Sequence, residues 1–458
     1  MEQHAMPNKA IVSEEKNIAS EQQRLTALVQ QTLAQAKKMG ATAAEVAVSM
    51  EKGFSVNVRM GEVDMVEHHN HKGISISLYV GQQKGSASTS DIANEAITET
   101  LQKAFNIARY TSADPYAGLA AKELMAFNYL DLDLFHPWAL APVEAIEIAR
   151  DCEAKGRAFD KRITNSEGAS VSSHDLIAIY GNSHGFIGGF PASRHGISLS
   201  LIAQEGASMQ RDFNYTVARD PLDLVAINKI AEEAASKAVQ RLNSKRLSTR
   251  KVPVIFRADI ADGLLGCFIA AIRGSNLYRN ASFLLDHLGE AVFPKNINLR
   301  ELPHIRKGLA SAPFDGEGVI TRESDILKDG ILQRYVLSAY AARKLGMQTT
   351  GNAGGVHNAV ISTSDNDLPG LLKHMDKGLL VTELMGQGVN IVTGNYSRGA
   401  SGFWVENGEI QYPVEEITIA GNLKDMFAHL VLVGNDVDRR GSIHTGSILL
   451  EEMMIAGE

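Results

Sequence analysis

The chain has 458 residues, of which 44% are hydrophobic and 21% charged, and its formal net charge is -8. The length is sufficient for two or three domains, the composition excludes a wholly disordered or membrane-embedded chain, and the acidic balance argues against direct binding of nucleic acid. Only Cys152 and Cys267 are present and residues 1–10 lack an apolar signal segment, so we expect a cytoplasmic protein without a disulfide framework or membrane contact.

The first part of the chain predicts a helix followed by antiparallel strands. Residues 1–22 are polar, and we expect them to form a mobile N-terminus. Apolar residues then recur at helical spacing from Leu25 to Leu33, and Gly40 offers an end to that helix. From residue 46 to residue 78 the period changes to two. Because glycines interrupt this pattern, it predicts a meander of short strands separated at Gly53, Gly61, Gly73 and Gly81.

The pattern of helices and strands continues up to a domain boundary. Further helices are predicted after Ser90, from Pro142 towards Ala158 and around residues 224–242. The polar and basic stretch at residues 243–252 shows neither period, which is typical of a linker. We therefore expect an N-terminal α+β domain at residues 23–248, with short antiparallel strands and amphipathic helices, and a second domain at residues 249–458.

The second domain is predicted to consist mainly of β-hairpins. A strand at residues 252–256 is followed by an amphipathic helix that ends at Gly274. Asn407-Gly408 and Asp329-Gly330 each separate two strand-like runs, and both pairs suit a type I′ turn because they tolerate positive φ. We expect a predominantly antiparallel sheet, curled or barrel-like, with few helices. The predicted fold class of the whole chain is α+β.

One short motif suggests a serine hydrolase. Gly181-Asn-Ser-His-Gly185 matches the G-x-S-x-G pattern of a nucleophile elbow, in which the serine follows a strand and precedes a helix. Residues 186–191 are poor helix formers, and on extended backbone His184 would point away from Ser183. The sequence therefore favours a hairpin turn at this position.

Histidines suggest a metal site at one place. In Glu67-His68-His69-Asn70-His71, the side chains of His69 and His71 would share one face of a strand, and the alternative is a solvated strand end. None of the 14 histidines precedes a glutamate, so the His-Glu pair of a helical zinc peptidase is absent. Cys267 lies on the predicted amphipathic helix, which favours a buried thiol over a nucleophile.

A longer pattern extends from residue 381 to residue 425. It reads Val-Thr-Glu-Leu-Met-Gly-Gln-Gly, then Ser-Arg-Gly-Ala-Ser-Gly-Phe-Trp-Val-Glu-Asn-Gly-Glu-Ile, then Glu-Ile-Thr-Ile-Ala-Gly-Asn-Leu-Lys-Asp. This closely resembles the C-terminal signature of the TldD/PmbA family, also called modulators of DNA gyrase. With shorter matches at residues 84–88, 107–111, 130–137 and 162–165, the resemblance covers roughly residues 25–458. The signature residues, to which we assign no role at this stage, are Gly386, Gly388, Tyr396, Arg398, Gly399 and Trp404.

The resemblance implies a cytoplasmic proteolytic assembly in which one subunit holds zinc through a helical His-Glu-x-x-x-His motif and a C-terminal cysteine. The corresponding helix of this chain has Gly266, Cys267 and Ala271 where His, Glu and His would fall, and a four-residue spacing meets Ala270. Thr445-Gly446 stands roughly where the zinc subunit has Cys-Gly. The resemblance therefore implies a metal-free, TldE-type partner with no catalytic residue or metal of its own.

The family's activity gives further expectations about partners. The resemblance implies a TldD-type zinc subunit and a peptide or unfolded protein as partners, with removal of microcin-type leaders and degradation of an antitoxin as activities. The chain alone could form a homodimer, and Asn395–Arg398 is a candidate for lining a substrate chamber. Two alternatives are an autonomous hydrolase that uses Ser183 or residues 68–71, and a non-enzymatic protein that acts on gyrase inhibition.

Overall fold

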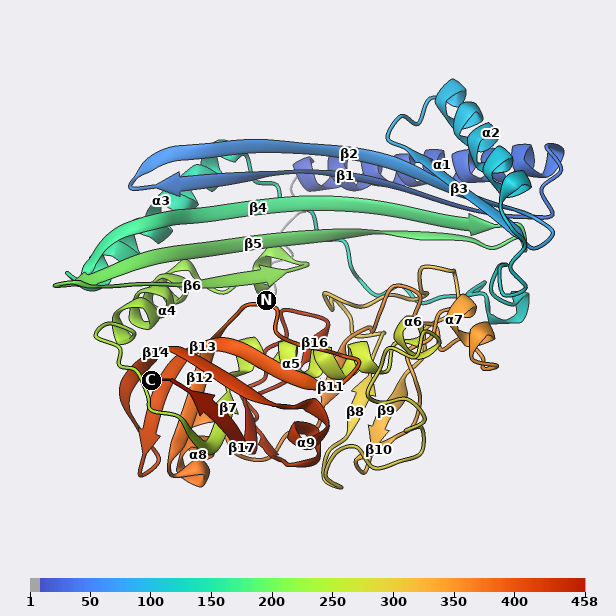
Figure 1. The fold of residues 1–458 in the computed structure, drawn as a ribbon. Helices are drawn as coiled ribbons and strands as arrows, with labels where there is room; N and C mark the ends of the chain where they lie inside the picture. The colour runs from blue at the N-terminus through green and yellow to red at the C-terminus, as the bar shows by residue number, and fades with distance from the viewer. Residues whose placement is uncertain (1–8, 458) are drawn as a thin grey trace, which may run out of the picture.

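The computed structural model describes residues 9–457, and its mixture of helices and mainly antiparallel strands confirms the expected α+β class (Figure 1). The N-terminal half is built on a six-stranded antiparallel sheet in the order β3-β2-β1-β4-β5-β6. Its strands are β1 (Ala43–Arg59), β2 (Glu62–Val80), β3 (Gln83–Thr89), β4 (Ile163–Asn182), β5 (Ile187–Glu205) and β6 (Ser208–Ala218). Its helices are α1 (Lys9–Lys38), α2 (Asn94–Tyr110), α3 (Pro142–Phe159) and α4 (Ile227–Gln240).

The strands of this sheet are long, so the prediction of short strands is wrong. β1 has 17 residues and β2 has 19, and Gly53 and Gly73 lie inside them. A Cβ atom added to Gly53 would lie 2.3 Å from the carbonyl oxygen of Ser173 on β4. This glycine therefore marks a close approach of two backbones, which sequence alone does not distinguish from a turn. Gly61 and Gly81 do lie in turns, with φ of 83° and 60°.

The N-terminus also differs from the expectation. Residues 1–8 lie outside the described residues, but residues 9–22 belong to α1, so the expected mobile segment is wrong for that part. The physical reason is that this stretch is rich in Ala, Glu, Lys and Gln, which are strong helix formers. The side-chain nitrogen of Gln22 also donates a hydrogen bond of 3.1 Å to the Gly189 carbonyl oxygen on β5.

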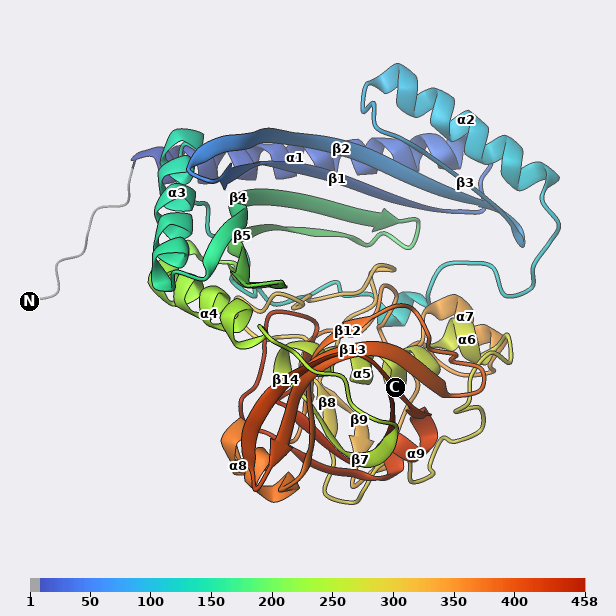
Figure 2. The same ribbon diagram turned by 60° about the vertical axis from the view of Figure 1, so that its left-hand side comes forward.

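The helices of the N-terminal half cover one face of the sheet, and the other face turns towards the C-terminal half (Figures 1 and 2). Val46 and Val48 of β1 pack under α1 and α2, while Val56 and Val58 of the same strand pack under α3 and α4. The opposite face carries polar residues such as Ser49, and the strands therefore alternate as expected for a sheet with one covered face.

The C-terminal half contains a closed barrel, as predicted. The strand order is β14-β13-β12-β7-β17-β15, and an additional pairing of β14 with β17 closes the ring. A second sheet has the order β10-β9-β8-β11-β16. The barrel strands are β7 (Arg250–Phe256), β12 (Gly378–Met385), β13 (Asn395–Glu406), β14 (Glu409–Asn422) and β17 (Ile448–Ala456), with β15 (Leu430–Val433) beside them. The other strands are β8 (Leu299–Glu301), β9 (Ser324–Lys328), β10 (Ile331–Leu332), β11 (Ala359–Ile361) and β16 (Ile443–His444).

The helices of this half are few, as predicted, and most of them are short. They are α5 (Ala258–Ala271), α6 (Gly274–Leu277), α7 (Ala339–Lys344), α8 (Leu368–Met375) and α9 (Leu423–Ala428). Both predicted hairpin turns are confirmed: φ is 55° and 71° at Asn407 and Gly408, and 50° and 74° at Asp329 and Gly330. Within residues 9–457, none of the helices is long and apolar enough to cross a membrane.

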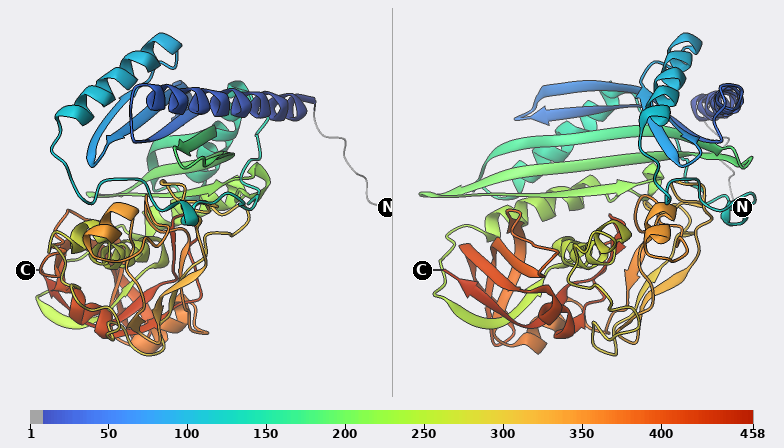
Figure 3. Two further views of the ribbon diagram at one scale, coloured as in Figure 1. Left: turned by 90° about the vertical axis from the view of Figure 1, so that its right-hand side faces the viewer. Right: turned by 45° about the vertical axis from the view of Figure 1, so that its right-hand side comes forward.

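Helix α5 lies between the barrel and the second sheet, in contact with β12 and β16 (Figure 3). Leu264, Leu265 and Phe268 form its buried stripe and belong to the core of the C-terminal half. This packing leaves Gly263, Gly266 and Cys267 on a side of α5 that is not fully buried. That side faces a cleft between the two halves of the molecule.

Gly53→Ala is expected to lower the free energy of unfolding by about 1–3 kcal/mol, because β1 and β4 would have to separate to admit the new Cβ atom. Gly73→Ala is the matched control: the nearest atom to its Cβ would be 3.9 Å away. Since alanine loses less conformational entropy on folding than glycine, the control should be neutral or stabilising by roughly 0.5 kcal/mol. Urea unfolding midpoints measure both, and equal midpoints would contradict the close approach at Gly53.

Candidate functional site

A cleft of about 370 Å³ lies between the two halves of the molecule. One wall consists of β6 and α4, and the other consists of α5, β12, β13 and the loop that precedes β16. Figure 1 shows β6 and α4 above α5 and β13. The lining is strongly charged and combines residues that lie far apart in the sequence. We treat this cleft as the candidate functional site.

The floor of the cleft is formed by the outer side of α5. Gly263 lines the cleft, and a Cβ atom added to Gly263 or Gly266 would meet no atom within 4 Å. Cys267 is half-buried one turn further along, and its thiol donates to the Gly263 carbonyl oxygen at 3.3 Å. Burial raises the pKa of Cys267, so the thiol stays protonated near neutral pH.

The residues of α5 do not fit a zinc ion. Of the three positions predicted from the sequence, Gly266 has no donor atom, Cys267 is a protonated thiol, and Ala271 is fully buried in the core. Ala270, the position given by the shorter spacing, is partly exposed but also lacks a donor. Among the described residues, no group of three or more His, Cys, Asp or Glu side chains is arranged to hold a metal ion.

Ion pairs tie the two walls of the cleft together. Arg241, which follows the last residue of α4, pairs with Asp212 of β6 at 3.2 Å and with Glu383 of β12. Lys237 of α4 pairs across the cleft with Asp259 of α5 at 3.2 Å. The two halves therefore meet through charged contacts at this place, in addition to the chain connection.

Arg440 adds another contact between the halves. Its guanidinium lies over the ring of Tyr215, 4.1 Å from the centroid, and its Nη1 donates to the Tyr215 carbonyl oxygen at 3.1 Å. The same side chain pairs with Asp438. Arg440 thus fixes the loop before β16 against the edge of β6.

Two signature residues, Tyr396 and Arg398, lie on β13 close to Cys267. Tyr396 is only 2% exposed and its hydroxyl has no partner at hydrogen-bonding geometry. Burial raises the pKa of Tyr396 to about 12, and the positive charge of Arg398 opposes this rise, as it does for Cys267. Arg398 lines the cleft, and its Nε atom is buried without a hydrogen-bond partner.

The other signature residues support the connection between β12 and β13. Gly386 has φ of 78°, and a Cβ atom on Gly388 would lie 1.8 Å from the Ser397 carbonyl oxygen. A Cβ atom on Gly399 would lie 3.3 Å from the Cβ of Met385. These glycines let the two strands approach each other. Trp404 is buried in the barrel, and its Nε1 donates to Glu406 at 3.1 Å.

The serine motif forms a hairpin turn, as the sequence favoured. Ser183 lies between β4 and β5, and Gly185 has φ of 90°. The Ser183 hydroxyl accepts a hydrogen bond of 3.0 Å from the backbone N–H of Ala44. A strand, not a helix, follows the turn, so the geometry of a nucleophile elbow is absent.

The histidines of β2 are brought together with a residue that the sequence did not indicate. His69 lies on the polar face of the sheet, with its ring centroid 4.9 Å from that of His174 on β4 and 5.8 Å from that of His71. Its Nε2 lies 3.2 Å from the Ser55 hydroxyl, and His68 is on the opposite face of β2. Only the pairing of β1 with both β2 and β4 could have revealed His174.

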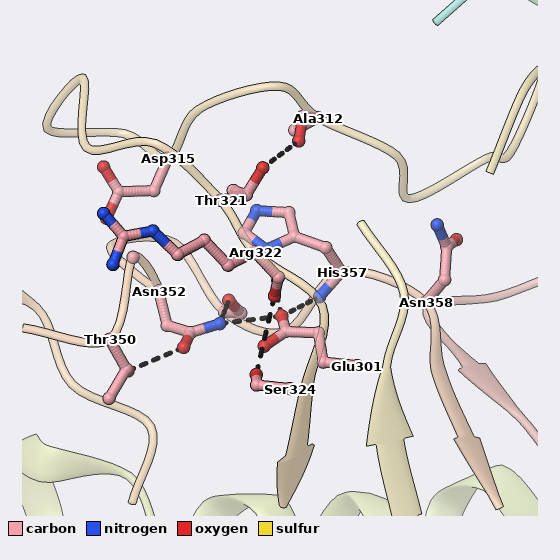
Figure 4. A network of polar contacts seen from close by, with 12 residues as sticks. Glu301, Ala312, Asp315, Thr321, Arg322, Ser324, Thr350, Asn352, His357 and Asn358 are labelled. Atoms are coloured by element: carbon pink, nitrogen blue, oxygen red, sulfur yellow. Dashed lines mark hydrogen bonds and ion pairs between the residues drawn. The ribbon is translucent and has the colours of Figure 1, made fainter. Parts of the chain in front are cut away.

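A separate network of buried polar groups surrounds Glu301 at the end of β8 (Figure 4). This carboxylate is 2% exposed, accepts hydrogen bonds from Asn352 at 2.8 Å and the backbone N–H of His357 at 2.6 Å, and pairs with Arg334. Burial opposes its ionisation, but the hydrogen bond from His357 and the charge of Arg334 hold the pKa of Glu301 below its usual range. The network anchors the loop of residues 351–358.

Glu301→Gln is expected to destabilise the protein by about 3 kcal/mol near neutral pH, because Arg334 would remain buried without a counter-charge. Glu323→Gln is the matched control: Glu323 pairs with Arg300 at 3.6 Å and both are more than half exposed, so a change below about 1 kcal/mol is expected. Since the pKa of Glu301 is lowered by folding, its contribution is present above about pH 4 and is lost as the pH falls. The free energy of unfolding of the native chain and of both variants is measured at pH 7 and pH 3. If the difference between the native chain and Glu301→Gln is the same at both pH values, the pH dependence is contradicted.

Comparison with known proteins finds similarity along nearly the whole chain. Domain models described as PmbA/TldA metallopeptidase domain 1, central domain and C-terminal domain match residues 44–108, 135–242 and 249–457. "Metalloprotease PmbA" of Escherichia coli O157:H7 is 52% identical over 91% of this chain and 92% of its own.

Solved structures show the same fold. A "putative modulator of DNA gyrase" from Bacteroides thetaiotaomicron has a TM-score of 0.89 and 29% identity, and the match covers 94% of this chain and 98% of that one. TldE from Thermococcus kodakarensis has a TM-score of 0.80 at 22% identity, covering 94% and 100% of the two chains, which shows likeness of fold alone.

Proposed function

Since the chain belongs to the PmbA/TldA metallopeptidase family, we propose that it acts as the metal-free, TldE-type subunit of a zinc peptidase made of two kinds of chain. In this proposal a TldD-type partner supplies the zinc ion and the groups that activate water. This chain supplies part of the wall of a cytoplasmic chamber and holds the peptide. Its substrates are small or unfolded peptides, such as microcin-type leaders and an antitoxin.

The observation that carries this proposal is the set of side chains on α5. A zinc peptidase needs imidazole or carboxylate donors and a carboxylate that activates water. The outer side of α5 instead presents Gly263, Gly266 and Ala270 around a protonated thiol. Such a helix leaves the cleft open and provides no side chains that could hold a metal ion as a Lewis acid.

The open face of the N-terminal sheet supports a role in holding peptide. A second groove, of about 900 Å³, lies between this face and the loop of residues 314–316. Its sheet side presents serine hydroxyls from three strands, Ser49, Ser75 and Ser88. These hydroxyl groups can donate or accept hydrogen bonds, and apolar residues such as Phe190 and Phe314 line the rest of the groove, so it offers both kinds of contact to an extended chain.

The purified chain alone is expected to contain no stoichiometric zinc and to cleave no unfolded peptide. Mixed with a zinc-bearing TldD-type chain, it should give peptide cleavage that chelators abolish and that exceeds the rate of the TldD-type chain alone. Metal analysis and a peptide cleavage assay on the three samples measure this. Chelator-sensitive cleavage by this chain after rigorous removal of any partner would contradict the proposal.

Variants in the two alternative sites provide controls for the mixed sample. Ser183→Ala and the triple variant of His68, His69 and His71 to alanine should leave the cleavage rate of the mixture unchanged. A loss of activity in either variant with intact folding would favour an autonomous hydrolase. Capture of gyrase by this chain in the absence of a TldD-type chain would favour a non-enzymatic role.

A further inference from the structure

We infer that Arg398 binds a carboxylate of the peptide that occupies the cleft over α5. The chain would thereby select peptides that carry either a free C-terminal carboxylate or an Asp or Glu side chain at the bound position. This inference rests on the proposed function, because it takes a peptide as the ligand. It adds to that function a recognition residue and a ligand chemistry.

Among the described residues, Arg398 differs from the other cations of the cleft in having no ion-pair partner. The other cations of the lining all have a carboxylate partner, whereas Arg398 has no ion pair within residues 9–457. Its Nε atom is buried and unpartnered, which is costly because a polar group has lost water without gaining a hydrogen bond. The side chain as a whole is partly exposed in the cleft, so a bound carboxylate would supply the counter-charge that the guanidinium lacks. The existing pairs are Arg211–Glu167, Lys237–Asp259, Arg241–Asp212, Arg257–Asp259 and Arg440–Asp438.

The cleft that Arg398 lines has room for part of a peptide. Gly263 of α5 lines the same cleft, and open space surrounds the positions where side chains would begin at Gly263 and Gly266. The volume of about 370 Å³ is at the lower end of the range for small-ligand pockets. It therefore suits the end of a peptide or one of its side chains.

Several backbone groups on the outer edge of β6 already have partners, which argues against recognition of a peptide through that edge. This edge strand faces the cleft, but the Arg211 carbonyl oxygen accepts from Arg241 at 3.1 Å and the Tyr215 carbonyl oxygen accepts from Arg440 at 3.1 Å. The backbone N–H of Phe213 donates to the Asp212 carboxylate at 2.8 Å. Because these groups of the edge are already satisfied, a peptide gains little by adding to it as a strand. Side-chain recognition by Arg398 remains.

The charges of the lining also favour a carboxylate over a phosphate. Asp262 lines the same cleft without an ion pair among the described residues, and its charge would repel a multiply charged phosphate more strongly than a singly charged carboxylate. A planar guanidinium matches a single carboxylate in a bidentate arrangement. A peptide C-terminus and an Asp or Glu side chain both present one carboxylate group to Arg398. A set of matched peptides distinguishes these two sources.

The test uses three N-terminally labelled hexapeptides with one neutral sequence: the free acid, the C-terminal amide, and the amide with one Glu. Fluorescence anisotropy with the purified full chain measures their affinities. At least one carboxylate peptide should bind roughly tenfold more tightly than the neutral amide. The tighter of the two identifies the source of the carboxylate. Equal affinities of all three for the native chain would overturn the inference without any variant.

Variants then test whether Arg398 causes the tighter binding of the carboxylate peptides. Arg398→Gln should abolish the preference for a carboxylate peptide, and Arg398→Lys should retain part of it. Arg300→Gln, which removes an ion-paired arginine outside the lining of the cleft, should retain the preference fully. Thermal unfolding of each variant establishes that it folds. A preference that persists in a folded Arg398→Gln variant overturns the inference.

Cleavage by the mixed sample separates this inference from the proposed function. If the mixture cleaves peptides but shows no carboxylate preference in binding, the role of Arg398 is wrong and the proposed function stands. If the chain shows the preference but the mixture cleaves nothing, the proposed function is wrong and the binding site stands.

Discussion

The burial of one side of α5 between the barrel and the second sheet is the contact on which the C-terminal half depends. Leu264, Leu265 and Phe268 are almost inaccessible, and each such side chain contributes about 1.5–3 kcal/mol when fully buried. Phe268 also meets Phe293 and Phe427 edge to face, at centroid distances of 5.1 and 5.7 Å. A helix held in this way cannot rotate about its axis. The orientation of its outer side, and with it the floor of the cleft, is therefore fixed by the core.

The walls of the cleft are fixed by a different kind of contact. Arg241 and Asp212 are 13% and 11% exposed, so their ion pair is largely removed from water, and breaking such a pair leaves an uncompensated charge. Lys237 and Arg440 reach across from opposite sides to the other half of the molecule. These contacts hold β6 over α5, so the space next to Arg398 is set by both halves of the chain.

Local features of the fold could be predicted from the sequence, whereas distances between backbones could not. The Asn407-Gly408 turn was predictable because its φ requirement is met by the two residues themselves. The role of Gly53 was not, since it depends on a carbonyl oxygen of Ser173 on another strand. The same holds for the cleft. That Arg398 lacks an ion-pair partner in the described part of the chain could not be predicted, because it depends on which carboxylates the neighbouring cations contact in the folded chain. The sequence indicated Arg398 through the family signature and as part of Asn395–Arg398, a candidate for lining a substrate chamber, but it gave no ligand for this side chain.

The pairing of β1 with β4 has a consequence for how the N-terminal half folds. β1 and β2 are neighbours in the chain, but the other edge of β1 pairs along 14 residues, from Glu45 to Val58, with a strand that begins at Ile163. The chain between β1 and β4 contains β2, β3, α2 and α3, and closing this long loop costs conformational entropy before any of the pairing is gained. Non-local pairings of this kind slow folding. The step that commits the sheet to its final shape is thus the closure of β1 onto β4, and until then the long hairpin of β1 and β2 exposes an edge open to pairing with other chains.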